Sequence, residues 1–303
     1  MTTLKERHQR QALSRLCLLF GMTRQAYYQH YWQKEETSFE QELVIKEVLR
    51  IRETHKKMGC RKLMVKLEAF MFDHQIKMGR DALFDLLAAN QLLIRRRNRR
   101  VTTTYSSHWL RKYPNLIREF IAEGINQLWV SDITYWRFKD KFLYISFVTD
   151  VFSHKIVGYH LSESLEAESS IHALQMALDL LRQPVEGLIH HSDRGIQYCC
   201  KEYVKLLQDH SVAISMTENG DPLENAFAER INGIVKGEYL DCYKVNSIQE
   251  AKELLSQVVH LYNQERPHMS IGNKTPEEIH QTNQKTDRLW KNYYPKNRTL
   301  VNQ

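Results

Sequence analysis

The segment GLIHHSDRG at residues 187–195 is the most informative part of this sequence, because it sets Asp193 directly behind a short apolar run typical of a buried strand. Glu229 follows after 35 intervening residues, and Asp132 lies upstream in the strand-like run LWVSDIT at residues 128–134. Mg²⁺ prefers oxygen ligands, and two such ions about 3.5–4 Å apart hold the attacking and leaving oxygens of a phosphoryl transfer. These three carboxylates are therefore the candidate catalytic and metal-binding groups.

Extended patterns surround Asp132 and predict a sheet. Three runs rich in β-branched and aromatic residues, at 128–138, 142–151 and 155–161, are joined by short turns and predict three antiparallel strands. Helical spacing then alternates with apolar runs: a helix around Ile171 to Leu181, a strand at 187–191, a helix at 198–210 and a strand at 212–216. This succession predicts an α/β domain of the ribonuclease-H-like class.

Glu229 falls in a helix predicted over residues 221–238. Asp221 is the expected N-cap, with Pro222 at the first helical position and Glu224 placed for a capping box. A buried stripe is expected at Leu223, Phe227, Ile231 and Ile234, and a second face at Asn225, Glu229, Asn232 and Lys236. Glu229 then leans toward the strand ends, while Asn225 and Lys236 are candidate DNA contacts. A last helix, from Ser247 to Asn263, has a second expected capping box at Ser247 and Glu250.

The first 30 residues predict two short helices around a turn. Gly21 breaks the first helix, and Thr23 is placed to cap a second one in which Arg24 and Gln25 point outward. This pattern fits a helix-turn-helix whose second helix enters a major groove, with Arg24 and Gln25 as DNA contacts. An ordinary helical hairpin fits these residues equally well.

A second helical block follows, with a break around Gly59 and a further helix at about 79–90. Its candidate DNA contacts are basic: Arg61, Lys62, Lys66, Lys77 and Arg80. A solvated helix face explains any single one of them as well.

The run RRRNRR places Arg95, Arg96, Arg97, Arg99 and Arg100 within six residues, followed by a stretch with little to pack. Such a run repels itself unless an anion is present, so it predicts a basic linker along DNA. The net charge is +7, and residues 1–120 carry 24 Lys and Arg against 12 Asp and Glu, whereas the rest carries 19 against 24. The basic front half suits a phosphate backbone, and the acidic remainder suits a metal-binding domain.

Five cysteines without a Cys-x-x-Cys spacing predict reduced thiols in a cytoplasmic protein. No segment approaches the ~20 apolar residues of a membrane span. Fourteen histidines raise the possibility of zinc, but none lies in a paired cysteine arrangement, so structural zinc is not expected.

The motifs together resemble those of the DDE transposases of the insertion-sequence-three family, in particular their catalytic second reading frame. The resemblance is carried in order by WVSDITY at 129–135, HSDRGIQY at 191–198, SMTENGDP at 215–222, NAFAE at 225–229 and YNQERPH at 262–268. Two positions depart from the family pattern, Glu224 and Arg230, and neither is a metal ligand.

The resemblance implies an integrase-like catalytic core preceded by all-α helix-turn-helix regions. It implies a transposase that binds the ends of its element, then cuts and joins DNA strands with two Mg²⁺ ions, for which Mn²⁺ substitutes, at Asp132, Asp193 and Glu229. Partners implied are DNA ends, target DNA, further copies of the chain on DNA, and a separately encoded upstream DNA-binding protein. Two alternatives remain: a DNA-binding repressor with an inactive nuclease fold, and a nuclease that only cuts.

Five regions are expected along the chain. They are a helix-turn-helix-like region at 1–38, a second helical region at 39–94, a basic linker at 95–122, the catalytic core at 123–282, and a basic, aromatic tail at 283–303.

Overall fold

The computed structural model describes residues 13–94, 109–181, 183, 185–218 and 225–289. Within these ranges the chain forms two compact units, which are described separately. The first unit takes the residues up to 53 together with 66–93, and the second takes 54–65 and the residues from 94 onward.

The first unit is helical. Its helices are α2 (Leu13–Leu19), α3 (Arg24–Thr54), the later part of α4 (Cys60–Asp73) and α5 (Arg80–Ala89). Gly21 has a φ of +64° between α2 and α3, and the Thr23 hydroxyl accepts a hydrogen bond from the backbone N–H of Ala26 at 3.0 Å. The predicted break and cap are therefore confirmed.

α3 has no break at residues 38 and 39, where the sequence analysis placed a boundary between two helical regions. The segment QKEETS at 33–38 contains neither glycine nor proline, so nothing in it interrupts the backbone hydrogen bonds. The fully buried side chains of Val44, Val48 and Leu67 with Leu83 and Leu87 supply apolar packing for these helices. The five-region division stays a prediction.

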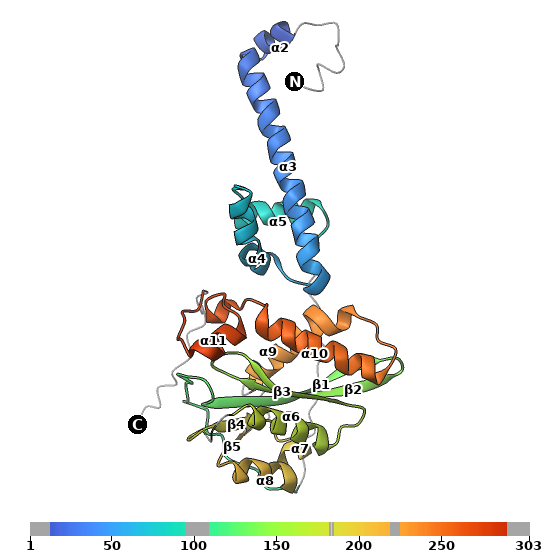
Figure 1. Ribbon diagram of the computed structural model, residues 1–303, viewed down its shortest axis with the longest axis vertical. Helices are drawn as coiled ribbons and strands as arrows, with labels where there is room; N and C mark the ends of the chain where they lie inside the picture. The colour runs from blue at the N-terminus through green and yellow to red at the C-terminus, as the bar shows by residue number, and fades with distance from the viewer. Residues whose placement is uncertain (1–12, 95–108, 182, 184, 219–224, 290–303) are drawn as a thin grey trace, which may run out of the picture. The chain divides into compact units, whose positions relative to one another are not determined.

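The second unit is built on a five-stranded mixed sheet (Figure 1). Its strands, β1 (Leu128–Phe138), β2 (Lys141–Asp150), β3 (Ile156–Ser162), β4 (Ile189–Ser192) and β5 (Ala213–Met216), lie in the order β3-β2-β1-β4-β5. The first three strands pair antiparallel, whereas β4 pairs in parallel with both β1 and β5. All five predicted strands are present, and the ribonuclease-H-like fold is confirmed.

Helices cover both faces of this sheet. On one face lie α6 (Ala167–Asp179), α7 (Ile196–Cys199) and α8 (Lys201–Asp209), and on the other lie α9 (Ala226–Ile234), α10 (Ile248–Gln264) and α11 (Pro276–Thr282) (Figure 1). Each face has its own apolar core, because alternate side chains of a strand point to opposite faces. Trp129, for example, packs with the α6 and α8 side, and Trp136 with the α9 and α10 side.

The contact between β3 and α6 depends on Gly158. A Cβ atom at this position would lie 2.0 Å from the carbonyl oxygen of Ala173 and 3.0 Å from the Cβ of Ala177. Only glycine lets the strand and the helix backbone approach this closely.

Three helix features differ from the sequence expectation. The helix predicted at 198–210 is interrupted at Cys200, which separates α7 from α8. At the start of α10, Ser247 accepts from the N–H of Glu250, but the Glu250 carboxylate returns to the N–H of Asn246, so only half of the expected capping box forms. A complete capping box, which the sequence analysis missed, joins Thr275 and Glu278 at α11.

The predicted cap at Asp221, Pro222 and Glu224 lies outside the described residues. Within them, α9 begins at Ala226 after Asn225. The helix then widens into a π turn, η2 (Val235–Tyr239), which is followed by a tighter 3₁₀ turn, η3 (Leu240–Cys242). The uniform helix expected up to residue 238 is therefore not found. In the part of the chain that is described, no helix is both long and apolar enough to cross a membrane.

Candidate active site

Strand register brings two of the three candidate acids together. β1 and β4 pair in parallel through Leu128 with Ile189 and Val130 with His191, an offset of 61 residues. Asp132 and Asp193 have the same offset, so they occupy neighbouring positions where β4 ends. The carboxyl ends of adjacent parallel strands are where α/β sheets place their ligand sites.

The electrostatics of Asp132 show that these charges are close. Loss of hydration, followed by the carboxylate of Asp193 and then that of Glu229, raises the pKa of Asp132 to about 8. Hydrogen bonds from the backbone of Ile133 and from Asn232 act in the opposite direction. The charges of Asp193 and Glu229 thus oppose the ionisation of Asp132, and a positive charge nearby would favour its carboxylate form.

Two asparagines join the catalytic strand to α9. Asn232 donates from Nδ2 to Oδ2 of Asp132 at 2.7 Å, and Asn225 donates from Nδ2 to the carbonyl oxygen of Ser131 at 3.2 Å. Both side chains are nearly buried, with 5% and 6% of their surface exposed. The amide of Asn232 thus fixes one carboxylate oxygen of Asp132.

The sequence analysis did not assign a site role to Asn232. The available signal was its position three residues after Glu229, on the same helix face. Asn225 was expected to contact DNA, and the structure gives its amide nitrogen a bond within the protein instead. Its contact with DNA stays a prediction.

Glu229 and Asp193 are held differently. Asp193 Oδ1 accepts a hydrogen bond from the N–H of Gly195 at 2.9 Å, which orients the carboxylate at the strand end. Glu229 is exposed on the first turn of α9. Among the described residues, no three His, Cys, Asp or Glu side chains stand close enough together to hold a metal ion. The structure thus brings Asp132 and Asp193 together and leaves Glu229 within electrostatic range.

Buried histidines support the strands behind the acids. His190 Nε2 is 2.7 Å from the hydroxyl of Ser131 and 2.9 Å from that of Tyr203, and burial lowers the pKa of His190 to about 3. His191 Nδ1 lies 2.8 Å from the hydroxyl of Ser215 on β5. The neutral imidazole of His190 therefore links β4 to β1 and α8 without placing a positive charge beside the acids, and His191 links β4 to β5.

The oxygen-rich donor set fits Mg²⁺ or Mn²⁺, which bind carboxylates. Asp132 and Asp193 occupy neighbouring positions on β1 and after β4, and Glu229 lies on α9; that they bind an ion stays a prediction. The same arrangement provides the carboxylates that a phosphoryl-transfer site uses.

The predicted DNA contacts occupy varied surroundings. Arg24 and Gln25 are exposed at the start of α3, as is Arg61 at the start of α4, whereas Arg80 is exposed and forms an ion pair with Asp81 at 2.7 Å. Lys62 is paired with Glu238 at 3.0 Å, and Lys236 is half-buried in the π turn. The arginines of the run at 95–100 lie outside the described residues.

The chain is similar to integrases and to transposases of insertion sequences. Two models, each described as an integrase core domain, match residues 122–222 and 210–276. The "Insertion element IS600 uncharacterized 31 kDa protein" of Shigella sonnei is 34% identical over 270 residues, which cover 86% of this chain and 96% of that protein.

Two further relatives carry transposase names. The "Transposase for insertion sequence element IS629" of Shigella sonnei is 33% identical over 234 residues, covering 77% of each chain. The "Transposase InsF for insertion sequence IS3A" of Escherichia coli (strain K12) is 32% identical over 182 residues, covering 59% of this chain and 63% of that protein.

Proposed function

The chain belongs to the insertion-sequence-three family of transposases, and we propose that it cuts the ends of its element and joins them to target DNA at one site formed by Asp132, Asp193 and Glu229. Family membership makes it a polynucleotidyl transferase. The observation that carries the proposed site is the shared 61-residue offset, which sets Asp132 beside Asp193. The charge of Glu229 also acts on Asp132.

Asp132 and Asp193 would hold the first divalent ion, and Asp193 or Glu229 the second. Bound there, two Mg²⁺ ions activate the attacking oxygen and stabilise the leaving oxygen. In the first step, water attacks a phosphodiester at the element's end, the P–O3′ bond breaks, and a free 3′-hydroxyl results. In the second, that hydroxyl attacks a phosphodiester of the target and displaces its 3′-oxygen, so one bond forms for each bond broken.

The protein's own side chains position these groups. Asn232 and the N–H of Gly195 orient the carboxylates of Asp132 and Asp193 before DNA arrives. Preorganised charge of this kind contributes most of the stabilisation in phosphoryl transfer, because little other chemistry is asked of the protein.

DNA binding is assigned to the basic residues of the front half and of α9. Arg24, Gln25, Arg61 and Arg80 supply contacts from helices, and Lys236 supplies one beside the catalytic helix. The run at 95–100 supplies sequence-independent phosphate contacts. We expect the protein to act in the cytosol, as several copies on DNA, with a separately encoded upstream DNA-binding protein as a further partner.

The test combines labelled element-end DNA with a supercoiled target in one reaction containing Mg²⁺. Joined products support a transposase, cut ends alone support a nuclease, and DNA that is bound but unchanged supports a repressor. Asp132→Asn, Asp193→Asn and Glu229→Gln are each expected to abolish cutting and joining, because an amide keeps the size of the carboxylate but loses the charge that holds the ion. Normal cutting by any one of them contradicts its role as a ligand.

Asp140→Asn is the matched control. It makes the same chemical change at an exposed position in the turn between β1 and β2, past the end of β1 at Phe138. We expect it to cut and join at the rate of the unaltered protein.

A further inference from the structure

The π turn η2 continues the helix that carries Glu229. Ile231, Val235 and Tyr239 follow one another at intervals of four residues, and each is at most 1% exposed. An α-helix turns 100° per residue, so this spacing drifts by about 40° at each step. The wider π turn offsets that drift and keeps Tyr239 facing the core. Isolated π turns are rare, and they are frequently found at functional sites.

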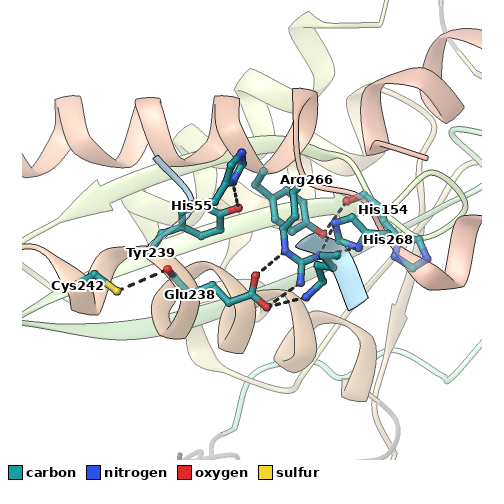
Figure 2. A network of polar contacts seen from close by, with 9 residues as sticks. His55, His154, Glu238, Tyr239, Cys242, Arg266 and His268 are labelled. Atoms are coloured by element: carbon teal, nitrogen blue, oxygen red, sulfur yellow. Dashed lines mark hydrogen bonds and ion pairs between the residues drawn. The ribbon is translucent and has the colours of Figure 1, made fainter. Parts of the chain in front are cut away.

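Glu238, within this turn, is held by two cations (Figure 2). Its carboxylate accepts from Nε and Nη2 of Arg266, both at 2.8 Å, and from Nζ of Lys62 at 3.0 Å. Burial opposes ionisation, but the hydrogen bonds and charges of Arg266 and Lys62 hold the pKa of Glu238 below its ordinary value. The carboxylate is therefore charged, and the guanidinium binds it in a bidentate ion pair.

The remaining donors of Arg266 are also fixed. Its Nη1 lies 2.9 Å from Nε2 of His268, and its side chain is only 3% exposed. Burial, followed by the charge of Arg266, lowers the pKa of His268, so that ring is neutral and accepts the hydrogen bond. Each of the three guanidinium nitrogens of Arg266 thus has a partner within the protein.

The neighbour of Glu238 is anchored as well. The Tyr239 hydroxyl is 2.9 Å from Nδ1 of His55, and Nε2 of His55 is 3.2 Å from the carboxylate of Glu265. His55 and Lys62 both come from the segment 54–65 of the second unit. Side chains from that segment and from the end of α10 therefore fix η2 at two successive residues.

We propose that Arg266 and Glu238 are positioning residues for strand joining, an inference that rests on the proposed function. They set the direction in which the side chain of Lys236, seven residues after Glu229, projects from the helix. Lys236 is the second residue of the π turn. If the turn relaxes to an α-helix, the rotation per residue changes, and with it the direction of Lys236 relative to Glu229. The ion pair acts through Lys236 and touches neither DNA nor metal.

A stability role alone predicts a different behaviour. Buried ion pairs give little net stability, because the loss of hydration offsets most of the attraction, so such a pair is weak evidence of a structural purpose. The contribution of the Glu238–Arg266 ion pair is to hold the two side chains in one geometry. A double-mutant cycle separates the two roles, because a residue that acts through Lys236 loses its effect once Lys236 is removed.

The experiment measures single-turnover joining and end-DNA affinity for the unaltered protein, Glu238→Gln, Lys236→Ala and the double variant. We expect Glu238→Gln to slow joining about tenfold alone and less than about twofold in the Lys236→Ala background. The same factor in both backgrounds, in joining and in affinity, overturns the proposal. Arg266→Lys keeps the positive charge but loses the bidentate geometry of the guanidinium. It is expected to show the same loss of effect in the Lys236→Ala background. If neither variant reaches a cooperative thermal transition, the pair is a stability element and the proposal fails.

Glu277→Gln is the matched control. Glu277 pairs with Lys155 at 2.7 Å, with side chains 14% and 17% exposed, on α11 and beside β3. Its effect is expected to be independent of Lys236. Absence of joining by the unaltered protein contradicts the transposase function itself, and the affinity cycle then tests the ion pair without the chemistry.

Discussion

Replacing Asn232 by leucine removes the amide that fixes Asp132 and changes little else, because the two side chains are similar in size. The lost contact is a 2.7 Å hydrogen bond to a carboxylate, in a position that is 5% exposed. Hydrogen bonds to charged groups contribute about 1.5–3 kcal/mol, which corresponds to about a ten- to hundredfold loss of rate. Asp132 would then rotate more freely and would hold an ion in the productive geometry less often.

The assay is single-turnover cutting of labelled end DNA at saturating Mg²⁺, with end-DNA affinity and thermal unfolding measured in parallel. We expect the rate to fall while the affinity stays within about twofold, because the hydrogen bond concerns the reacting acids and not the DNA backbone. Asn263→Leu is the control: its buried amide donates to the backbone carbonyl of Ile156 at 3.0 Å, so it is expected to lower stability and leave the cutting rate of the folded protein unchanged. Full activity of a folded Asn232→Leu protein would refute the orienting role of the amide.

Three other outcomes are expected. Gly158→Ala forces a Cβ to within 2.0 Å of the Ala173 carbonyl oxygen, so it should destabilise by about 3 kcal/mol, seen as a lower melting temperature; an unchanged transition contradicts the close approach. Burial lowers the pKa of His154 and His190 to about 3 from 6.5, so the unfolded chain binds more protons, and stability present above pH 6.5 should fall as the pH drops toward 3. Denaturant titrations at several pH values measure how the free energy of unfolding changes with pH. His190→Gln should lower the number of protons taken up on unfolding by about one. Chelation of divalent ions should stop cutting without preventing end-DNA binding, and either Mg²⁺ or Mn²⁺ should restore it; chelator-resistant cutting would contradict a metal site.

The sheet could be predicted because its strands carry their information locally. The run from Leu128 to Phe138 alternates between two buried faces, and its predicted limits coincide with β1. Asp193 was recognisable because it directly follows a short apolar run. The 61-residue separation from Asp132 was visible as a number, but only the parallel pairing of β1 with β4 gives it a meaning, since sequence spacing does not reveal strand register.

Features that depend on distant partners were not predictable. The π turn is stabilised by Arg266 and by residues of the segment 54–65, which a pattern confined to residues 221–238 does not contain. Lys62 was expected on a DNA-facing surface because basic side chains on helices usually serve solvent or phosphate, and its partner Glu238 is 176 residues away. Asn232 was placed on the correct face, but its bond to Asp132 required the approach of α9 to β1.

The segment 54–65 belongs to the second unit although residues of the first unit flank it on both sides. The polypeptide therefore passes between the two units three times, and no single cut separates them cleanly. A fragment that begins after the arginine run would contain all three acids yet lack His55 and Lys62, leaving Tyr239 and Glu238 without those partners. Excision of the catalytic core for separate study would thus alter the very turn that follows Glu229, and proteolysis or gene fusion near residue 94 would do the same. Supplying residues 54–65 as a separate peptide is the way to restore what such a fragment loses.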